Sequence, residues 1–154
     1  MNVEDLKALV QEIVKQACKL KDAHITETNA TVNYAAIFAQ SQQEYEKLLV
    51  AVKQIGKIIK ETPTGPLFQI NPLATVAGKL QLLKIRAPDK TRPERGDADF
   101  TITDYPAFKK TYLSKPGFKL IERQDFEMIE LIDLQFNVRA YFSYLPLDQQ
   151  LGLN

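Results

Sequence analysis

The order of the secondary-structure elements that the sequence predicts repeats once along the chain. Residues 31–40 are rich in β-branched and aromatic side chains and predict a strand. Residues 41–56, which follow, carry apolar side chains at helical spacing. Three short apolar segments separated by Pro and Gly then predict three more strands, in "KIIKETP", "GPLFQIN" and "KLQLLKIRAP". The first half is therefore predicted to form a β-α-β-β-β unit.

The pattern starts again after the charged loop at 89–96. "DADFTIT" predicts a strand, and "DYPAFKKTYL" predicts a helix with Asp104 as its cap and Pro106 in its first turn. The last three strands are predicted in "FKLIERQ", "FEMIELID" and "NVRAYFS". Because the order of elements repeats in full, we expect two βαβββ units, at 30–90 and 96–145, related by an approximate two-fold axis.

Local signals predict where the elements of the first unit begin and end. Ser41 and Glu44 have the spacing of a capping box at the start of the helix. Gly56 is expected to end that helix, because glycine tolerates the left-handed conformation that often follows a last turn. The segment "NPLATVAG" at 71–78 is expected to be a loop.

A helix is predicted to precede the first unit, over about residues 3–20, with Asn2 as its N-cap. We expect its apolar face to dock on the rest of the domain, because its opposite face mixes charges of both signs. His24 is expected in the loop that follows, so that residues 1–29 form an N-terminal extension. The apolar face consists of Val3, Leu6, Val10, Ile13 and Ala17.

Length and composition limit the class of protein. The 154 residues favour one domain, followed by a tail at 146–154 whose leucines need cover from the chain itself or from a partner. A net charge of +1 argues against an extended nucleic-acid surface. One cysteine, Cys18, excludes an internal disulfide, and one histidine argues against a zinc site. No apolar run approaches the ~18 residues of a membrane span. We therefore expect a cytoplasmic protein without a membrane or nucleic-acid partner.

Paired βαβββ units in a chain of this length resemble the glyoxalase, or vicinal-oxygen-chelate, superfamily. The segments "LLKIRAP" and "RPERGDADFTI", together with the N-terminal helix, look more narrowly like the YecM-type branch of that superfamily. The resemblance covers about residues 5–145. It implies an α+β fold in which the two units form a half-open barrel of curved strands around a central cleft.

The resemblance also implies where a site lies. Metal-using members place ligands at the start of the first strand and on the last strand of each unit, and the matching positions here are Asn33, Arg86, Asp99 and Tyr141. Only Asp99 is a good ligand for a divalent ion. An inward guanidinium at Arg86 would repel such an ion by roughly 8 kcal/mol at about 4 Å and an effective dielectric of ~20. We therefore expect these four residues to bind a ligand without a metal or other cofactor, and we identify no catalytic residue.

Two acids that share one face of the predicted strand at 97–103 give a sharper expectation. Asp97 is expected at the mouth of the strand, within reach of water. Asp99 is expected further in, beside the cleft, with a pKa lowered by pairing with Arg86.

Strand alternation gives two more expectations. Asn33 is expected to share the cleft face of its strand with Ala35 and Ile37. Glu130 is expected on the polar outer face of a hairpin.

Three functions are compatible with these residues. The first is binding of a small polar molecule, with anions included, in the cleft between the two units. The second is a lyase, isomerase or dioxygenase that depends on a divalent metal, as the resemblance implies. The third is a non-catalytic interaction domain that forms a homodimer. The sequence favours the first and names no substrate.

Overall fold

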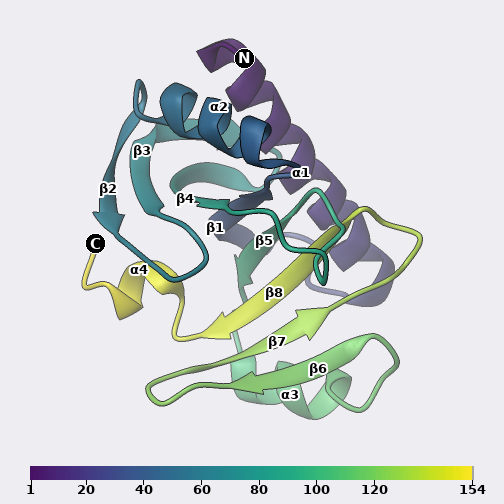
Figure 1. The fold of residues 1–154 in the computed structure, drawn as a ribbon. Coiled ribbons are helices and arrows are strands. Elements are labelled where there is room, and N and C mark those ends of the chain that lie inside the picture. Colours follow the sequence, from purple (N-terminus) through teal and green to yellow (C-terminus); the bar gives the residue numbers. More distant parts are fainter. Residues whose placement is uncertain (154) are drawn as a thin grey trace.

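The strands of the two halves form one mixed sheet of eight strands, which stays open between its edge strands (Figure 1). A computed structural model describes residues 1–153. The strand order is β2-β3-β4-β1-β5-β8-β7-β6, so β2 and β6 are the edges. The first unit consists of β1 (Thr31–Phe38), α2 (Gln42–Val52), β2 (Gly56–Lys60), β3 (Leu67–Thr75) and β4 (Gly78–Arg86).

The second unit repeats the first. It consists of β5 (Gly96–Thr101), α3 (Tyr105–Tyr112), β6 (Phe118–Glu122), β7 (Glu127–Leu131) and β8 (Val138–Tyr144). In each unit the first strand pairs in parallel with the last, and β1 pairs antiparallel with β5 at the centre of the sheet. This symmetric order confirms the α+β fold of two βαβββ units that the sequence predicts.

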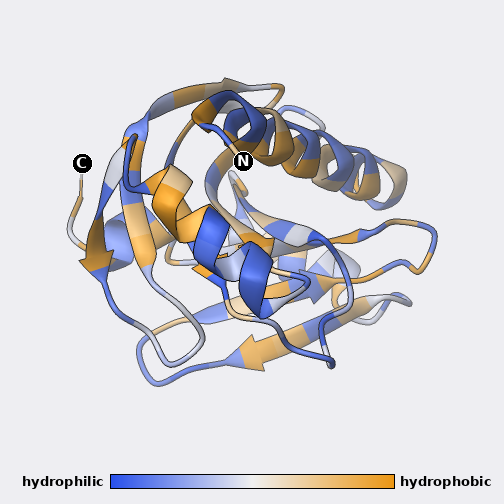
Figure 2. Ribbon diagram, turned by 45° about the horizontal axis from the view of Figure 1, so that its top comes forward, coloured by the Kyte–Doolittle hydropathy of each residue, from blue (hydrophilic) through white to orange (hydrophobic). Residues whose placement is uncertain are grey.

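The N-terminal helix α1 (Val3–His24) packs against the middle of the sheet, on strands β8, β1 and β5. Asn2 caps it as predicted, through a capping box with Asp5. Hydrophobic and hydrophilic residues alternate along every turn of α1 (Figure 2). Its buried side chains are Leu6, Val10, Ile13, Val14, Ala17, Leu20 and Lys21.

The helix is longer than predicted because Lys21 is held inside the protein. Its side chain is fully buried, donates to the carboxylate of Asp22 at 2.5 Å and to the carbonyls of Glu27 and Thr28, and lies 5.4 Å above the ring of Phe100. These contacts fix the last turn.

His24 lies in that last turn rather than in a loop, which corrects the prediction. Its Nε2 lies 2.8 Å from the carboxylate of Asp133, in the loop between β7 and β8.

Helix α2 ends four residues earlier than expected, at Val52, and Gly56 opens β2. A Cβ at Gly56 would lie 2.5 Å from the carbonyl oxygen of Gln69, so the close approach of β3 requires glycine there. Ser41 caps α2 as predicted. Glu44 instead turns its carboxylate to the amide of Gln40.

Strand β3 continues through the segment at 71–75 that the sequence predicted as a loop. A register shift between Gln69 and Leu73 accommodates the extra residues, and Leu73 then pairs with Leu80 of β4 and is buried. The turn is shorter than expected, at Val76–Ala77.

The C-terminal tail forms the short helix α4 (Leu147–Gln150), which contacts β1. Leu147, Leu151 and Leu153 are half-buried by the chain itself, whereas Leu145 is exposed. Among residues 1–153, no helix is both long and apolar enough to cross a membrane.

We predict that the docking of α1 contributes strongly to stability. Ile13→Ala is expected to lower the free energy of unfolding by about 2–5 kcal/mol, because it removes a fully buried side chain and leaves a cavity. The exposed Lys15→Ala, on the same helix, is expected to change it by less than about 0.5 kcal/mol. Urea denaturation measures both, and equal stability of the two variants would show that α1 is an appendage.

Candidate functional site

The face of the sheet turned away from α1, here called the concave face, carries a row of residues aligned across four strands. Lys84 of β4 pairs with Ala36 of β1, Ala36 pairs with Asp97 of β5, and Asp97 pairs with Arg139 of β8. Neighbouring strands lie about 4.8 Å apart, so the backbones at Lys84 and Asp97 are about 10 Å apart. Only the methyl group of Ala36 lies between them.

Ala36 is therefore the smallest side chain of this row, and it is buried beneath the larger side chains around it. It is here called the floor of the candidate site. Tyr34 and Phe38 flank it along β1, because alternate residues of a strand share a face. The intervening Ala35 and Ile37 point the other way, into the core beneath α1.

Three cationic side chains lie around Thr64 and Phe38, next to this floor. Lys84 Nζ and Arg86 Nη1 both donate to the hydroxyl of Thr64, at 2.5 and 3.4 Å. The guanidinium carbons of Arg86 and Arg92 lie 5.9 and 5.8 Å from the ring centroid of Phe38. Burial, and then the charge of Arg86, lower the pKa of Lys84 to about 8. Arg86 Nε is buried without a hydrogen-bond partner among residues 1–153.

Asp97 faces these cations and is only 7% exposed, so its expected position within reach of water was wrong. The reason is that β5 begins in the middle of the sheet. The amide of Arg95, before the strand, already bonds Asn137, and its carbonyl accepts from Phe38.

The surroundings of the Asp97 carboxyl disfavour its charged form. Burial, followed by the negative charge of Asp99, raises its pKa to about 7, although Arg92, Arg86 and Lys84 act in the opposite direction. Its Oδ1 is buried and has no hydrogen-bond partner within residues 1–153.

Asp99 lies one row further along the same face and does not pair with Arg86 as expected. It accepts hydrogen bonds from the amide and hydroxyl of Ser143 and from Asn33 Nδ2. Burial outweighs these bonds and raises its pKa to about 6, where the sequence predicted a lowered one. The register explains the error, because Arg86 aligns with Phe38 whereas Asp99 aligns with Tyr34.

Asn33 occupies a β-bulge, which breaks the alternation that the sequence prediction assumed. The register shifts between Val32 and Tyr34, so Tyr34 takes the concave face and Ala35 and Ile37 do not. Asn33 Nδ2 donates to Asp99 and, at 3.0 Å, to Thr101.

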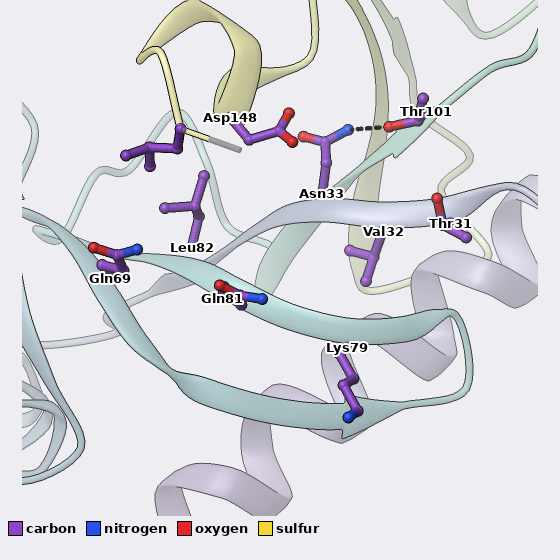
Figure 3. Close-up of a pocket in the computed structure, with 10 residues that line it drawn as sticks. Thr31, Val32, Asn33, Gln69, Lys79, Gln81, Leu82, Thr101 and Asp148 are labelled. Atoms are coloured by element: carbon purple, nitrogen blue, oxygen red, sulfur yellow. Dashed lines mark hydrogen bonds between the residues drawn. The ribbon is translucent and has the colours of Figure 1, made fainter.

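A separate hollow of about 240 Å³ lies beside Asn33, under the C-terminal tail (Figure 3). The side chains of Asn33 and Asp148 point toward one another there, and Gln69 and Gln81 lie on the adjacent strands. Its polar lining is mostly neutral, unlike the cationic site over Ala36.

Tyr141 and Arg139 belong to a network of hydrogen bonds and ion pairs with neighbouring side chains. The Tyr141 hydroxyl donates to Glu130 at 2.6 Å and accepts from Arg92 at 3.0 Å, and burial raises its pKa. Arg139 binds both Glu94 and Glu130. Glu130 is thus buried in this network and not on a polar outer face, which corrects the prediction.

Of the four candidates from the sequence, Arg86 and Tyr141 border the cationic site, while Asn33 and Asp99 bond each other in the next row. Sequence reasoning missed Lys84 and Arg92. Lys84 could have been found, because it lies two residues before Arg86 and shares its strand face.

Metal ligands do not gather in this part of the chain. Within residues 1–153, no three His, Cys, Asp or Glu side chains come together as a metal site requires. The oxygens of Asp99, the best candidate ligand, already accept from Ser143 and Asn33.

Two βαβββ units, paired through their first strands in a curved open sheet, are the arrangement expected from the superfamily resemblance. The chain has a glyoxalase-like fold. No family model and no curated protein matches its sequence. The solved structure "Structural Genomics, Protein EC4020" matches with a TM-score of 0.68 and 12% identity, over 91% of this chain and 86% of that one.

Two less similar solved structures are of proteins whose names state an activity or a superfamily. The methylmalonyl-CoA epimerase from Mycobacterium tuberculosis matches with a TM-score of 0.43 and 12% identity, over 80% of this glyoxalase-like chain and 94% of its own. A glyoxalase/bleomycin resistance protein/dioxygenase superfamily member from Vibrio splendidus 12B01 matches with 0.40 and 9%, over 73% and 97%. At these identities the likenesses concern the fold alone.

We predict that Asp97 makes the protein less stable as the pH rises from about 4 to 7. Its pKa is higher in the folded chain than in the unfolded one, so the folded state binds more protons in this window and loses stability when they leave. Asp97→Asn removes the effect. Between pH 5 and 8 the variant is expected to gain up to about 3 kcal/mol relative to the parent, at roughly 1.4 kcal/mol per pKa unit.

Urea denaturation of both proteins across that range measures the difference. Stability curves that run parallel from pH 5 to pH 8 would show that the pKa of Asp97 is not raised.

Proposed function

We propose that the chain binds a small molecule carrying an oxyanion on the concave face, over Ala36. In this proposal the two units act as one domain around the site. The observation that carries it is the grouping of Lys84, Arg86 and Arg92 around Thr64 and Phe38, beside the small side chain of Ala36.

The charges around Ala36 favour an anion. Apart from the ion pair of Arg86 with Asp89, the three cations face one carboxyl group, Asp97, whose raised pKa leaves it partly protonated near neutral pH. An anion about 4 Å from one such cation gains roughly 4 kcal/mol at an effective dielectric of ~20. An oxyanion would also offer acceptors to the guanidiniums, which bind carboxylate and phosphate in a forked geometry.

The network of Arg139, Glu94 and Glu130 next to the site supports the proposal, because its charges are paired whereas those around Ala36 are not fully paired. Arg139 is matched by Glu94 and Glu130, as expected of ion pairs that serve the fold. Within residues 1–153, Arg86 has Asp89, at 3.5 Å, and the neutral hydroxyl of Thr64, at 3.4 Å, while Lys84 has only that same hydroxyl. Half-buried cations with so few acceptors are typical of sites that a ligand completes.

We propose further that the site works without a divalent metal. A dication about 4 Å from any one of the three cations would be repelled by roughly 8 kcal/mol at an effective dielectric of ~20. Asp97 alone cannot offset three such repulsions. The metal-dependent chemistry that the superfamily resemblance implies therefore has no support from these residues.

Three expectations from the sequence remain predictions: the YecM-type branch, formation of a homodimer and the cytoplasmic location. None of them enters the argument for the site.

We predict that Arg86→Gln weakens binding of small oxyanions by about tenfold or more, the scale of one charge-assisted hydrogen bond. Isothermal titration calorimetry with inorganic phosphate and with lactate, at low ionic strength, measures the affinities. Arg123→Gln is the matched control, because Arg123 is exposed and, within residues 1–153, its guanidinium bonds only the carbonyl of Glu122. It is expected to bind like the parent.

Ala36→Leu tests the position of the ligand without changing any charge. Its larger side chain covers the floor, so binding is expected to weaken as much as in Arg86→Gln. The proposal fails if neither anion binds the parent, or if both site variants bind as well as Arg123→Gln does.

A further inference from the structure

Three buried polar side-chain atoms lack a partner within residues 1–153. One, Asn33 Oδ1, lies beside the hollow under the C-terminal tail. The other two belong to the residues around Ala36 and are of opposite kinds. Arg86 Nε is a hydrogen-bond donor, and Asp97 Oδ1 is an acceptor. Native proteins leave very few buried polar atoms unpaired, because water has been removed from them and nothing replaces it.

The two atoms do not bond each other. Arg86 of β4 is aligned with Phe38, two residues along β1 from Ala36. Asp97 is aligned with Ala36 and lies on the opposite side of β1, on β5. Lys84 also lies across Ala36 from Asp97 and is engaged by Thr64. A molecule seated over Ala36 is bounded by the donor on one side and the acceptor on the other.

We propose that the ligand of this site is a hydroxy acid, whose oxyanion binds Arg86, Lys84 and Arg92 and whose hydroxyl donates to Asp97 Oδ1. This inference rests on the proposed function and names its ligand class. It gives Asp97, which is more than nine-tenths buried, a role in specificity.

The donor group is a hydroxyl rather than an ammonium. An ammonium would bring a fourth positive charge next to three cations, whereas a hydroxyl donates a hydrogen bond without adding charge. A hydroxyl donor is also compatible with an Asp97 that is partly protonated, because Oδ1 keeps a lone pair in either form.

Matched pairs of ligands test the role of the hydroxyl. Lactate is compared with propionate, and 2-hydroxyethyl phosphate with ethyl phosphate, by calorimetry on the full chain. In at least one pair the hydroxylated member is expected to bind about tenfold more tightly, the scale of one hydrogen bond to a charged group. The pair that shows the preference identifies the head group as carboxylate or phosphate.

Asp97→Ala tests the partner of the hydroxyl. The variant is expected to bind the two members of that pair within about twofold of each other. It should keep or increase its affinity for the member without a hydroxyl, because a negative charge has been removed. Asp97→Asn keeps the shape and a carbonyl acceptor, and is expected to retain part of the preference. If Asp97→Ala does not fold, binding by Asp97→Asn shows whether Asp97 is the partner of the hydroxyl.

The outcomes separate this inference from the proposed function. If the parent binds both members of each pair equally, the hydroxy acid is wrong and the oxyanion site stands. If the preference survives unchanged in both Asp97 variants, Asp97 is not the partner and the inference is overturned. If none of the four ligands and no inorganic phosphate binds, the proposed function itself is wrong.

Discussion

The antiparallel pairing of β1 with β5 is the interaction on which both the fold and the candidate site depend. It joins the two βαβββ units and places Ala36 opposite Asp97. The two strands approach closely because residue 96 is glycine. A Cβ there would lie 2.3 Å from the carbonyl oxygen of Ala36 and 2.9 Å from Cδ1 of Ile13, on the helix that covers the other face. Gly96 is therefore in contact with α1 through Ile13 and with the first unit through Ala36. The docking of α1, the pairing of the two units and the alignment of the site all depend on this position.

The shifted pKa values of Asp97 and Lys84 favour the proposed binding role over a purely structural one. Burial moves two ionisable groups toward their neutral forms, raising the pKa of Asp97 to about 7 and lowering that of Lys84 to about 8. Such shifts in opposite directions, across the floor formed by Ala36, are typical of functional sites. The neighbouring network of Arg139, Glu94 and Glu130 shows that this sheet can bury charges in matched sets where only the fold is served.

The sequence predicted the element order well because its signals are local. Capping by Asn2, Ser41 and Asp104 needs only residues within one turn, and each cap forms as predicted. The errors concern features that depend on distant strands. The bulge at Asn33 arises where β1 pairs with β5, and it reverses which face Ala35 and Ile37 occupy. The burial of Asp97 depends on the backbone bond between residues 95 and 137, which no local pattern indicates. The expected pairing of Arg86 with Asp99 was wrong because Arg86 aligns with Phe38 and Asp99 with Tyr34, two rows apart on this face.

The most direct test of the oxyanion site is an amide NMR titration of the isotope-labelled chain with inorganic phosphate. We expect the largest chemical-shift changes at Ala36, which is the floor of the site, and at Lys84, Arg86 and Asp97 around it. The hollow under the C-terminal tail, lined by Gln81 and Asp148 among others, should change little. Changes centred on that hollow, or none above those of a matched chloride titration, would contradict the central claim that the concave face over Ala36 binds an oxyanion.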